Sequence, residues 1–161
     1  MLGEISGVYR KSGGSTGASS SVNYRTIPQG YVDLGLPSGT LWKNANEGGD
    51  YARYTYNEAV NRWGSKLPTK EQLEELKDKC TWKWTGSGYK VTGPNGNSIT
   101  LPAAGIRLCY GDVGGVGALG YYWSSSPDDS DIAWNLYFNS SKVYVIRGSR
   151  SNGQSVRLVQ N

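Results

Sequence analysis

Four strand-like runs between residues 121 and 160 constrain the fold of this chain more than any other feature. They cover residues 121–123, 133–138, 142–146 and 155–159. In the second run, Trp134, Leu136 and Phe138 occupy every second position. Because successive side chains of a β-strand point to opposite faces, such residues share one face. The alternation therefore predicts half-buried antiparallel strands with these three side chains in the core.

The residues between them define the opposite face. We expect Asn135, Tyr137 and Asn139 to face solvent, beside Tyr144 and Ile146 of the next run. The outward set mixes Asn, Tyr, Ser, Ile, Gly and Arg, without a charge pattern or a catalytic pattern. Ordinary exposed strand faces have similar mixtures, so composition alone leaves the role of this face open.

The remainder of the chain completes an α+β pattern. A length of 161 residues with 37% apolar residues is enough for one domain with a core, and 23 glycines indicate many turns. Two helices are predicted from capping boxes, in which a threonine caps the helix and a residue three positions later reaches back. Thr55 and Glu58 form the first, and Thr69 and Gln72 form the second. Short strands follow the helices, which is typical of an α+β fold.

The first 29 residues are predicted to be separate from the domain. Residues 12–21 are a Gly/Ser-rich stretch with the composition of a flexible linker, and residues 30–161 contain the periodic runs. Such a linker could present the domain at a distance from a larger body, and the N-terminal segment could support an oligomer. A loose N-terminal tail explains the composition equally well.

Charge and hydropathy argue against two classes of partner. The net charge is +4 with both signs interspersed, and no polybasic arm is present, so nucleic acid is not an expected partner. No apolar run is long enough to span a bilayer, and the first residues do not have the pattern of a signal peptide. We expect neither membrane insertion nor a nucleic-acid interface.

Candidate catalytic and metal sites are not found in the sequence. The chain has no histidine, which removes the commonest general base and metal ligand. Cys80 and Cys109 are too far apart for a CxxC site; Cys80 is expected to be a buried thiol, with a Cys80–Cys109 disulfide as the alternative. The acidic run containing Asp128, Asp129 and Asp131 is expected to be a solvated loop. No catalytic residue, cofactor or metal is predicted.

Several segments together resemble one family. The motifs are WSSS at 123–126, AWNLYF at 133–138, RSNGQSVRLV at 150–159, and matching segments at 31–42, 67–69, 88–98 and 101–105. They are similar to variable proteins of diversity-generating retroelements from gut bacteria and their phages, in the formylglycine-generating-enzyme-like branch of the C-type lectin fold. The resemblance implies two helices packed on short antiparallel sheets, with a variable region at about 121–160.

The resemblance also implies a function and a set of site residues. Such proteins display a diversified surface that binds protein or cell-surface ligands, at the bacterial surface, after export, or on a phage particle. Retroelement mutagenesis at adenines produces a restricted residue set that the outward positions largely match. The expected ligand-binding residues are Asp131, Ile132, Asn135, Tyr137, Asn139, Tyr144, Ile146, Gly148, Ser149, Ser151 and Asn152.

Two activities of related proteins are not expected here. The cysteines that formylglycine-generating enzymes use in the C-terminal part of the fold are absent after Cys109. Calcium-dependent lectins use a carboxylate before Pro-Asn and after Trp-Asn, but Gly93 and Leu136 occupy those positions.

The second function that the sequence allows is a structural or tip subunit of a phage tail or surface fibre.

Overall fold

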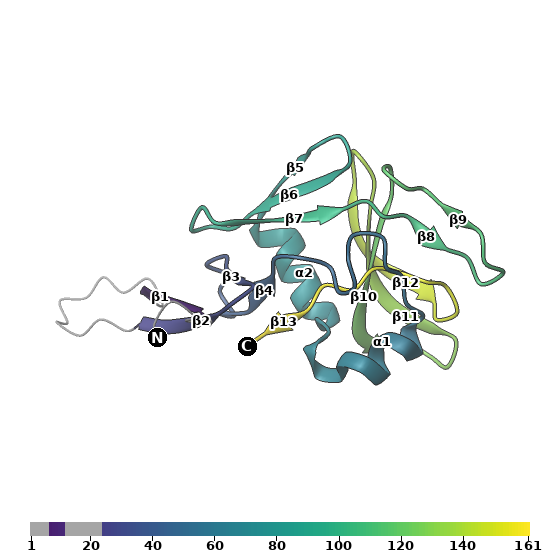
Figure 1. Ribbon diagram of the computed structural model, residues 1–161, viewed down its shortest axis with the longest axis horizontal. Coiled ribbons are helices and arrows are strands. Elements are labelled where there is room, and N and C mark those ends of the chain that lie inside the picture. The colour runs from purple at the N-terminus through teal and green to yellow at the C-terminus, as the bar shows by residue number, and fades with distance from the viewer. Residues whose placement is uncertain (1–6, 12–23) are drawn as a thin grey trace.

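A computed structural model describes residues 7–11 and 24–161, and the predicted Gly/Ser linker lies outside these residues. The described chain is an α+β structure in which two helices accompany several short antiparallel sheets (Figure 1). The helices are α1 (Tyr56–Trp63), the short 3-10 helix η2 (Gly64–Lys66) and α2 (Lys70–Lys79). Neither α-helix is long and apolar enough to cross a membrane.

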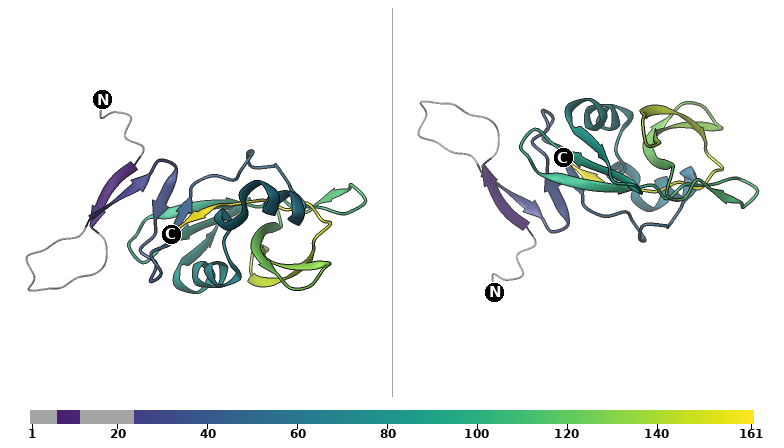
Figure 2. Two further views of the ribbon diagram at one scale, coloured as in Figure 1. Left: turned by 90° about the horizontal axis from the view of Figure 1, so that it is seen from below. Right: turned by 90° about the horizontal axis from the view of Figure 1, so that it is seen from above.

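The strands form five small antiparallel sheets. They are β1 (Gly7–Lys11) with β2 (Tyr24–Pro28); β3 (Tyr31–Asp33) with β4 (Leu41–Lys43) and β13 (Val159–Gln160); β5 (Thr81–Trp84), β6 (Gly88–Thr92) and β7 (Ser98–Pro102); β8 (Ile106–Arg107) with β9 (Val113–Gly114); and β10 (Gly120–Pro127), β11 (Ile132–Phe138) and β12 (Val143–Ser149). The β1–β2 hairpin projects from one end of the molecule, with β2 in contact with β3 (Figure 2).

Both predicted helices are confirmed, with the capping boxes that predicted them. Thr55 Oγ1 accepts from the backbone N–H of Glu58, whose carboxylate accepts from the Thr55 N–H at 2.8 Å. Thr69 and Gln72 form the same reciprocal pair at the start of α2. Each box satisfies two N–H groups that an isolated helix start leaves unpaired, so both helices begin at the residues that the sequence indicated.

The core has two parts. The larger lies between α2, the β5–β7 sheet and the β10–β12 sheet, and its buried members include Leu73, Leu76, Tyr89 and Phe138. The smaller cluster lies beside α1 and consists of Tyr56, Ala59, Leu67, Trp123, Ala133, Val156 and Leu158. The β10–β12 sheet contributes to both clusters, so it is held from two sides.

The segment that leads into β13 is more deeply buried than the half-buried strand that the alternation predicted. Residues 153–159 are all buried, and only the last of them belongs to β13, so the predicted strand over 155–159 is wrong in extent. Arg157 is 1% exposed; its guanidinium donates to Asn46 Oδ1 and to the carbonyls of Lys43 and Thr100. The charged side chain makes no ion pair within the described residues, and carbonyl and amide oxygens solvate it instead.

Two other expectations concern the cysteines. Cys80 and Cys109 are both free thiols, which excludes the disulfide alternative, and Cys80 is half-buried against the larger core cluster, not fully buried. The glycine-rich stretch 111–120 contains β9 and the first residue of β10. Its glycines permit close contacts: a Cβ on Gly120 would lie 2.1 Å from the Phe138 ring.

Candidate binding surface

The predicted ligand-binding residues fall on and around the β10–β12 sheet. β11 is the central strand, and its register places Tyr122, Leu136 and Val145 side by side on one face. That face packs against α2 and is called the helix face here. The opposite face contains the row formed by Tyr121, Tyr137 and Tyr144, and is called the far face.

The helix face is buried only in part. Leu136 and Phe138 are 1% and 0% exposed, as the alternation predicted. Trp134 was expected in the core but is only partly buried, and Lys70, the first residue of α2, lies over it with its ammonium 3.8 Å from the ring centroid. A cation over an indole ring is favourable, so Trp134 is held in place without being buried.

The far face exposes an aromatic patch at one end. The rings of Tyr121 and Tyr137 have centroids 5.1 Å apart, and those of Tyr137 and Tyr144 lie 6.3 Å apart and nearly parallel. Tyr144 is 44% exposed and the neighbouring Ile146 is 36% exposed. Burial and the adjacent Tyr137 raise the pKa of the Tyr121 phenol. The tyrosine row, Tyr121, Tyr137 and Tyr144, therefore presents aromatic rings and hydroxyls from three adjacent strands of one sheet.

Asn135 does not face solvent, contrary to the sequence prediction. It is 1% exposed, it pairs with Trp123 in the register, and its side-chain oxygen and the amide nitrogen of Gln154 both lie next to Gly148. Its amide nitrogen donates to the Leu136 carbonyl at 3.1 Å, whereas Oδ1 has no hydrogen-bond partner within the described residues. The same oxygen lies 2.4 Å from the place that a Cβ on Gly148 would take. Asn135 and Gly148 are thus packed against each other inside the predicted surface.

The other predicted residues form two groups at opposite ends of the sheet. Asn139 lies at the β11–β12 turn near the tyrosine row, and its side chain accepts from the Ser141 and Lys142 N–H groups. Ile132, the first residue of β11, pairs with Ser149, the last residue of β12, at the other end of the sheet. The remaining three positions, Asp131, Ser151 and Asn152, lie in the loops beyond those ends.

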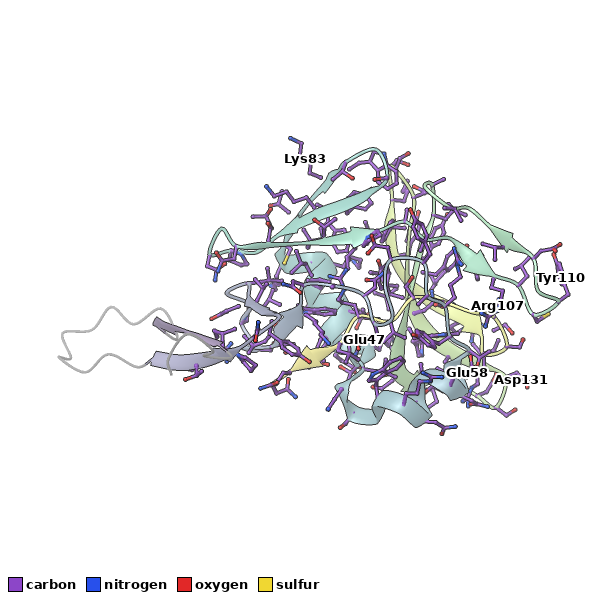
Figure 3. All side chains as sticks on the ribbon, viewed as in Figure 1. Glu47, Glu58, Lys83, Arg107, Tyr110 and Asp131 are labelled. Atoms are coloured by element: carbon purple, nitrogen blue, oxygen red, sulfur yellow. The ribbon has the colours of Figure 1, made fainter. Side chains whose placement is uncertain are left out.

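A polar pocket of about 480 Å³ opens at this second end. Its lining residues are Thr55, Asn57, Ser130, Asp131, Ser149, Arg150 and Ser151. Three of them were predicted from the sequence, and the pocket adds Thr55 and Asn57 from the start of α1. Figure 3 labels Asp131, in the loop between β10 and β11, and Glu58, in the first turn of α1.

The polar side chains of Ser124, Asp128 and Asp129 have local partners. The hydroxyl of Ser124 donates to the Trp134 carbonyl, and Asp129 accepts from the backbone of its own loop, at Asp131 and Ile132. Asp128 pairs with Arg147 at 3.1 Å. No group of three or more acidic or cysteine side chains that could hold a metal occurs in the described part of the chain.

The comparison with family models identifies one family. The model described as a domain of unknown function (DUF8237) matches residues 67–159, which is more than half of the chain. The chain belongs to the DUF8237 family. No curated protein and no solved structure matches it. The DUF8237 match begins just before α2 and ends at the first residue of β13, so it contains the whole β10–β12 sheet and every predicted surface residue.

Within the DUF8237 segment, sequence reasoning missed Tyr121, the pocket residues Ser130 and Arg150, and the buried side chain of Gln154. Tyr121 was assigned to a strand but not to the binding face, although its place opposite Tyr137 in β10 completes the tyrosine row. Arg150 was treated only as part of a motif, and it lines the polar pocket. Gln154 is buried beside Asn135. The aromatic run at 121–123 was a usable signal for Tyr121, but no local pattern marks Gln154.

Proposed function

We propose that this protein is a ligand-binding display module. In this proposal the fold is a C-type-lectin-like scaffold of the formylglycine-generating-enzyme-like branch. A retroelement diversifies its C-terminal surface so that it recognises protein or cell-surface ligands, on a bacterial surface, after export or on a phage particle. The proposal assigns no catalytic residue, cofactor or metal, and neither nucleic acid nor membrane insertion.

The observation that supports it is the tyrosine row with Ile146 on the far face. Tyrosine has few side-chain rotamers and exposes both an apolar ring and a hydroxyl, which makes it effective in binding surfaces. Here the rings lie on the central strand and both neighbours of a sheet whose opposite face packs on α2. A partner therefore meets side chains that are already ordered, and little conformational entropy remains to be lost.

The exposure of the surface residues is compatible with diversification. Substitutions at exposed positions such as Tyr144, Ile146, Asp131 and Ser151 remove no core contact, and such changes usually alter stability by less than about 0.5 kcal/mol. The fold is held by other residues, chiefly the two core clusters and Arg157. Folding and recognition are therefore assigned to different side chains.

The second candidate function is a structural or tip subunit of a phage tail or surface fibre. The β1–β2 hairpin favours it, since this hairpin extends away from the body (Figure 2). A two-stranded hairpin is only marginally stable alone in water, so a neighbouring chain that packs on it would stabilise it. The two functions are compatible, because a tip subunit can also present a binding face.

Two libraries displayed on yeast test the display function. The first randomises Tyr137, Asn139, Tyr144 and Ile146. The control library randomises the same number of exposed positions on the β5–β7 sheet, namely Thr81, Lys83, Lys90 and Thr100. Both are selected against purified lysozyme and serum albumin. We expect specific binders from the first library only, because its positions lie in and beside the tyrosine row. Equal yields from both libraries would refute the assignment of the binding face.

The retroelement itself is tested in the DNA next to the gene. We expect a reverse transcriptase gene and a template repeat that matches the codons of about residues 121–160 and differs from them mainly at adenines. A neighbourhood without such a repeat would remove the diversification mechanism and leave only a binding module with a fixed surface.

A further inference from the structure

The polar pocket differs from the tyrosine row in having no aromatic side chain in its lining. All seven lining side chains are polar: four hydroxyls, one amide, one carboxylate and one guanidinium. Small-molecule sites usually have volumes of roughly 300–1,000 Å³ and mostly apolar walls. This pocket, at about 480 Å³, is of that size but has no apolar side chain in its lining.

The walls of the pocket are fixed to one another. The N–H of Tyr56, the first residue of α1, donates to the Arg150 carbonyl at 3.1 Å, and the Arg150 N–H donates to the Asp131 carbonyl at 2.9 Å. The Arg150 guanidinium donates to the carbonyls of Ile132 and Asp129, and its carbon lies 4.8 Å from the centroid of the Tyr56 ring. Three segments that are distant in sequence therefore form one rigid site, which a ligand does not have to order.

Several groups in the pocket keep unused hydrogen-bonding capacity. The Asp131 carboxylate, the Asn57 amide and the Ser130 hydroxyl make no hydrogen bond within the described residues, and Nη1 of Arg150 is also unused there. Ser149 and Ser151 share one hydrogen bond between their hydroxyls at 2.9 Å. The pocket thus offers both acceptors and donors, several of them hydroxyls.

The charges in the lining restrict the ligand. Asp131 and Arg150 are the charged lining residues, and their formal charges cancel. A phosphate or sulfate group would face the Asp131 carboxylate with one arginine to balance it, and an ammonium group would face Arg150. An apolar ligand would leave the lining groups desolvated without partners, which is unfavourable. A neutral ligand with many hydroxyl groups meets none of these objections.

We infer that the polar pocket binds a neutral saccharide, a mono- or disaccharide unit of a glycan. Sugar hydroxyls both donate and accept, so they can match the carboxylate, the guanidinium and the serine hydroxyls at once. The inference rests on the proposed function, since Asp131, Ser149 and Ser151 belong to the surface assigned there. It adds that this end of the surface recognises carbohydrate, while the tyrosine row recognises protein.

Titration calorimetry on the unmodified protein tests the inference. The probes are glucose, galactose, mannose, N-acetylglucosamine, lactose and maltose, with inorganic phosphate and lysine as charged comparisons. We expect saturable binding of at least one sugar with a Kd on the order of 1 mM or below, and no binding of phosphate or lysine. Asp131→Ala and Asn57→Ala should each weaken sugar binding by about tenfold, since each removes a hydrogen-bonding group.

Asp128→Ala is the matched control. Asp128 lies in the same loop as Asp131, but its carboxylate pairs with Arg147 and does not line the pocket. Sugar binding should be unchanged in this variant, and thermal unfolding should show all three variants folded. The inference is overturned if no sugar binds, if phosphate or lysine binds instead, or if Asp131→Ala and Asn57→Ala bind like the control.

The two proposals fail separately. Absence of sugar binding, with specific protein binders obtained from the Tyr137 library, would overturn the saccharide inference alone. Sugar binding with a library that yields no protein binders would overturn the assignment of the tyrosine row alone, because the library leaves every pocket residue unchanged.

Discussion

Gly148→Ala tests whether the predicted surface contains positions that the packing fixes. A Cβ at this position would lie 2.4 Å from Asn135 Oδ1 and 3.2 Å from Gln154 Nε2, whereas ordinary contacts begin near 3.4 Å. The Asn135 oxygen must therefore move by about 1 Å, in an interior where overpacking costs about 1–3 kcal/mol. The φ angle of Gly148 is not positive, so alanine adds no backbone strain and recovers roughly 0.5–1 kcal/mol of chain entropy. The net loss of stability should be about 1–2 kcal/mol.

The assay is urea unfolding followed by tryptophan fluorescence, with Gly114→Ala as control. Gly114 also lies in a strand and has no positive φ, but nothing lies within 4 Å of its Cβ position. Gly114→Ala should be neutral or slightly stabilising. A double-mutant cycle with Asn135→Ala should show a coupling of roughly 0.5–3 kcal/mol, because the alanine removes the oxygen that Gly148→Ala displaces. If Gly148→Ala unfolds like Gly114→Ala, the packing argument is refuted.

Three further results are expected from stability and labelling measurements. Phe138→Ala should cost about 3–5 kcal/mol in urea unfolding, because the ring is fully buried among four aromatic neighbours; a cost below about 1 kcal/mol would contradict this. Leu76→Ala should lower the free energy of unfolding by roughly 2–5 kcal/mol because it truncates a core side chain, and Thr69→Ala by about 1 kcal/mol because it removes the helix cap. A larger loss for Thr69→Ala than for Leu76→Ala would mean that the buried face of α2 is wrongly assigned. Burial, with Glu75 nearby, raises the pKa of the Cys80 thiol to about 11. At pH 8, iodoacetamide should therefore label the exposed Cys109 before Cys80, which mass spectrometry of the labelled peptides would show. Equal labelling rates for the two cysteines would contradict this expectation.

Local signals predicted the helices because capping is local chemistry. Thr55 with Glu58, and Thr69 with Gln72, lie within one helical turn, and each pair determines its own helix start. The C-type-lectin-like fold was expected instead from a resemblance that is spread over several segments of the chain. The structure is in agreement with its coarser content, two helices with short antiparallel sheets.

The burial of individual β11 side chains could not be predicted, because alternation separates two faces without saying what covers each. Trp134 and Asn135 are one residue apart and both were assigned to the wrong environment. Trp134 lies where α2 only begins, and Asn135 lies where Gln154 returns along the chain. Both environments depend on contacts between distant segments, which period-two patterns do not encode. The polar pocket was missed for the same reason, since Asn57 and Asp131 are far apart in sequence.

The burial of the chain end has a consequence for synthesis. The last residues pair with β4 through Trp42 and Val159, and Arg157 donates to Asn46 and Thr100. None of these contacts can form until the codons for residues 157–160 have been translated, so a nascent chain that stops short of them has an incomplete core. A premature stop codon anywhere between β10 and β13 leaves a product that cannot close the β3–β4–β13 sheet. Such products should be degraded, so that only chains translated through β13 accumulate in the cell.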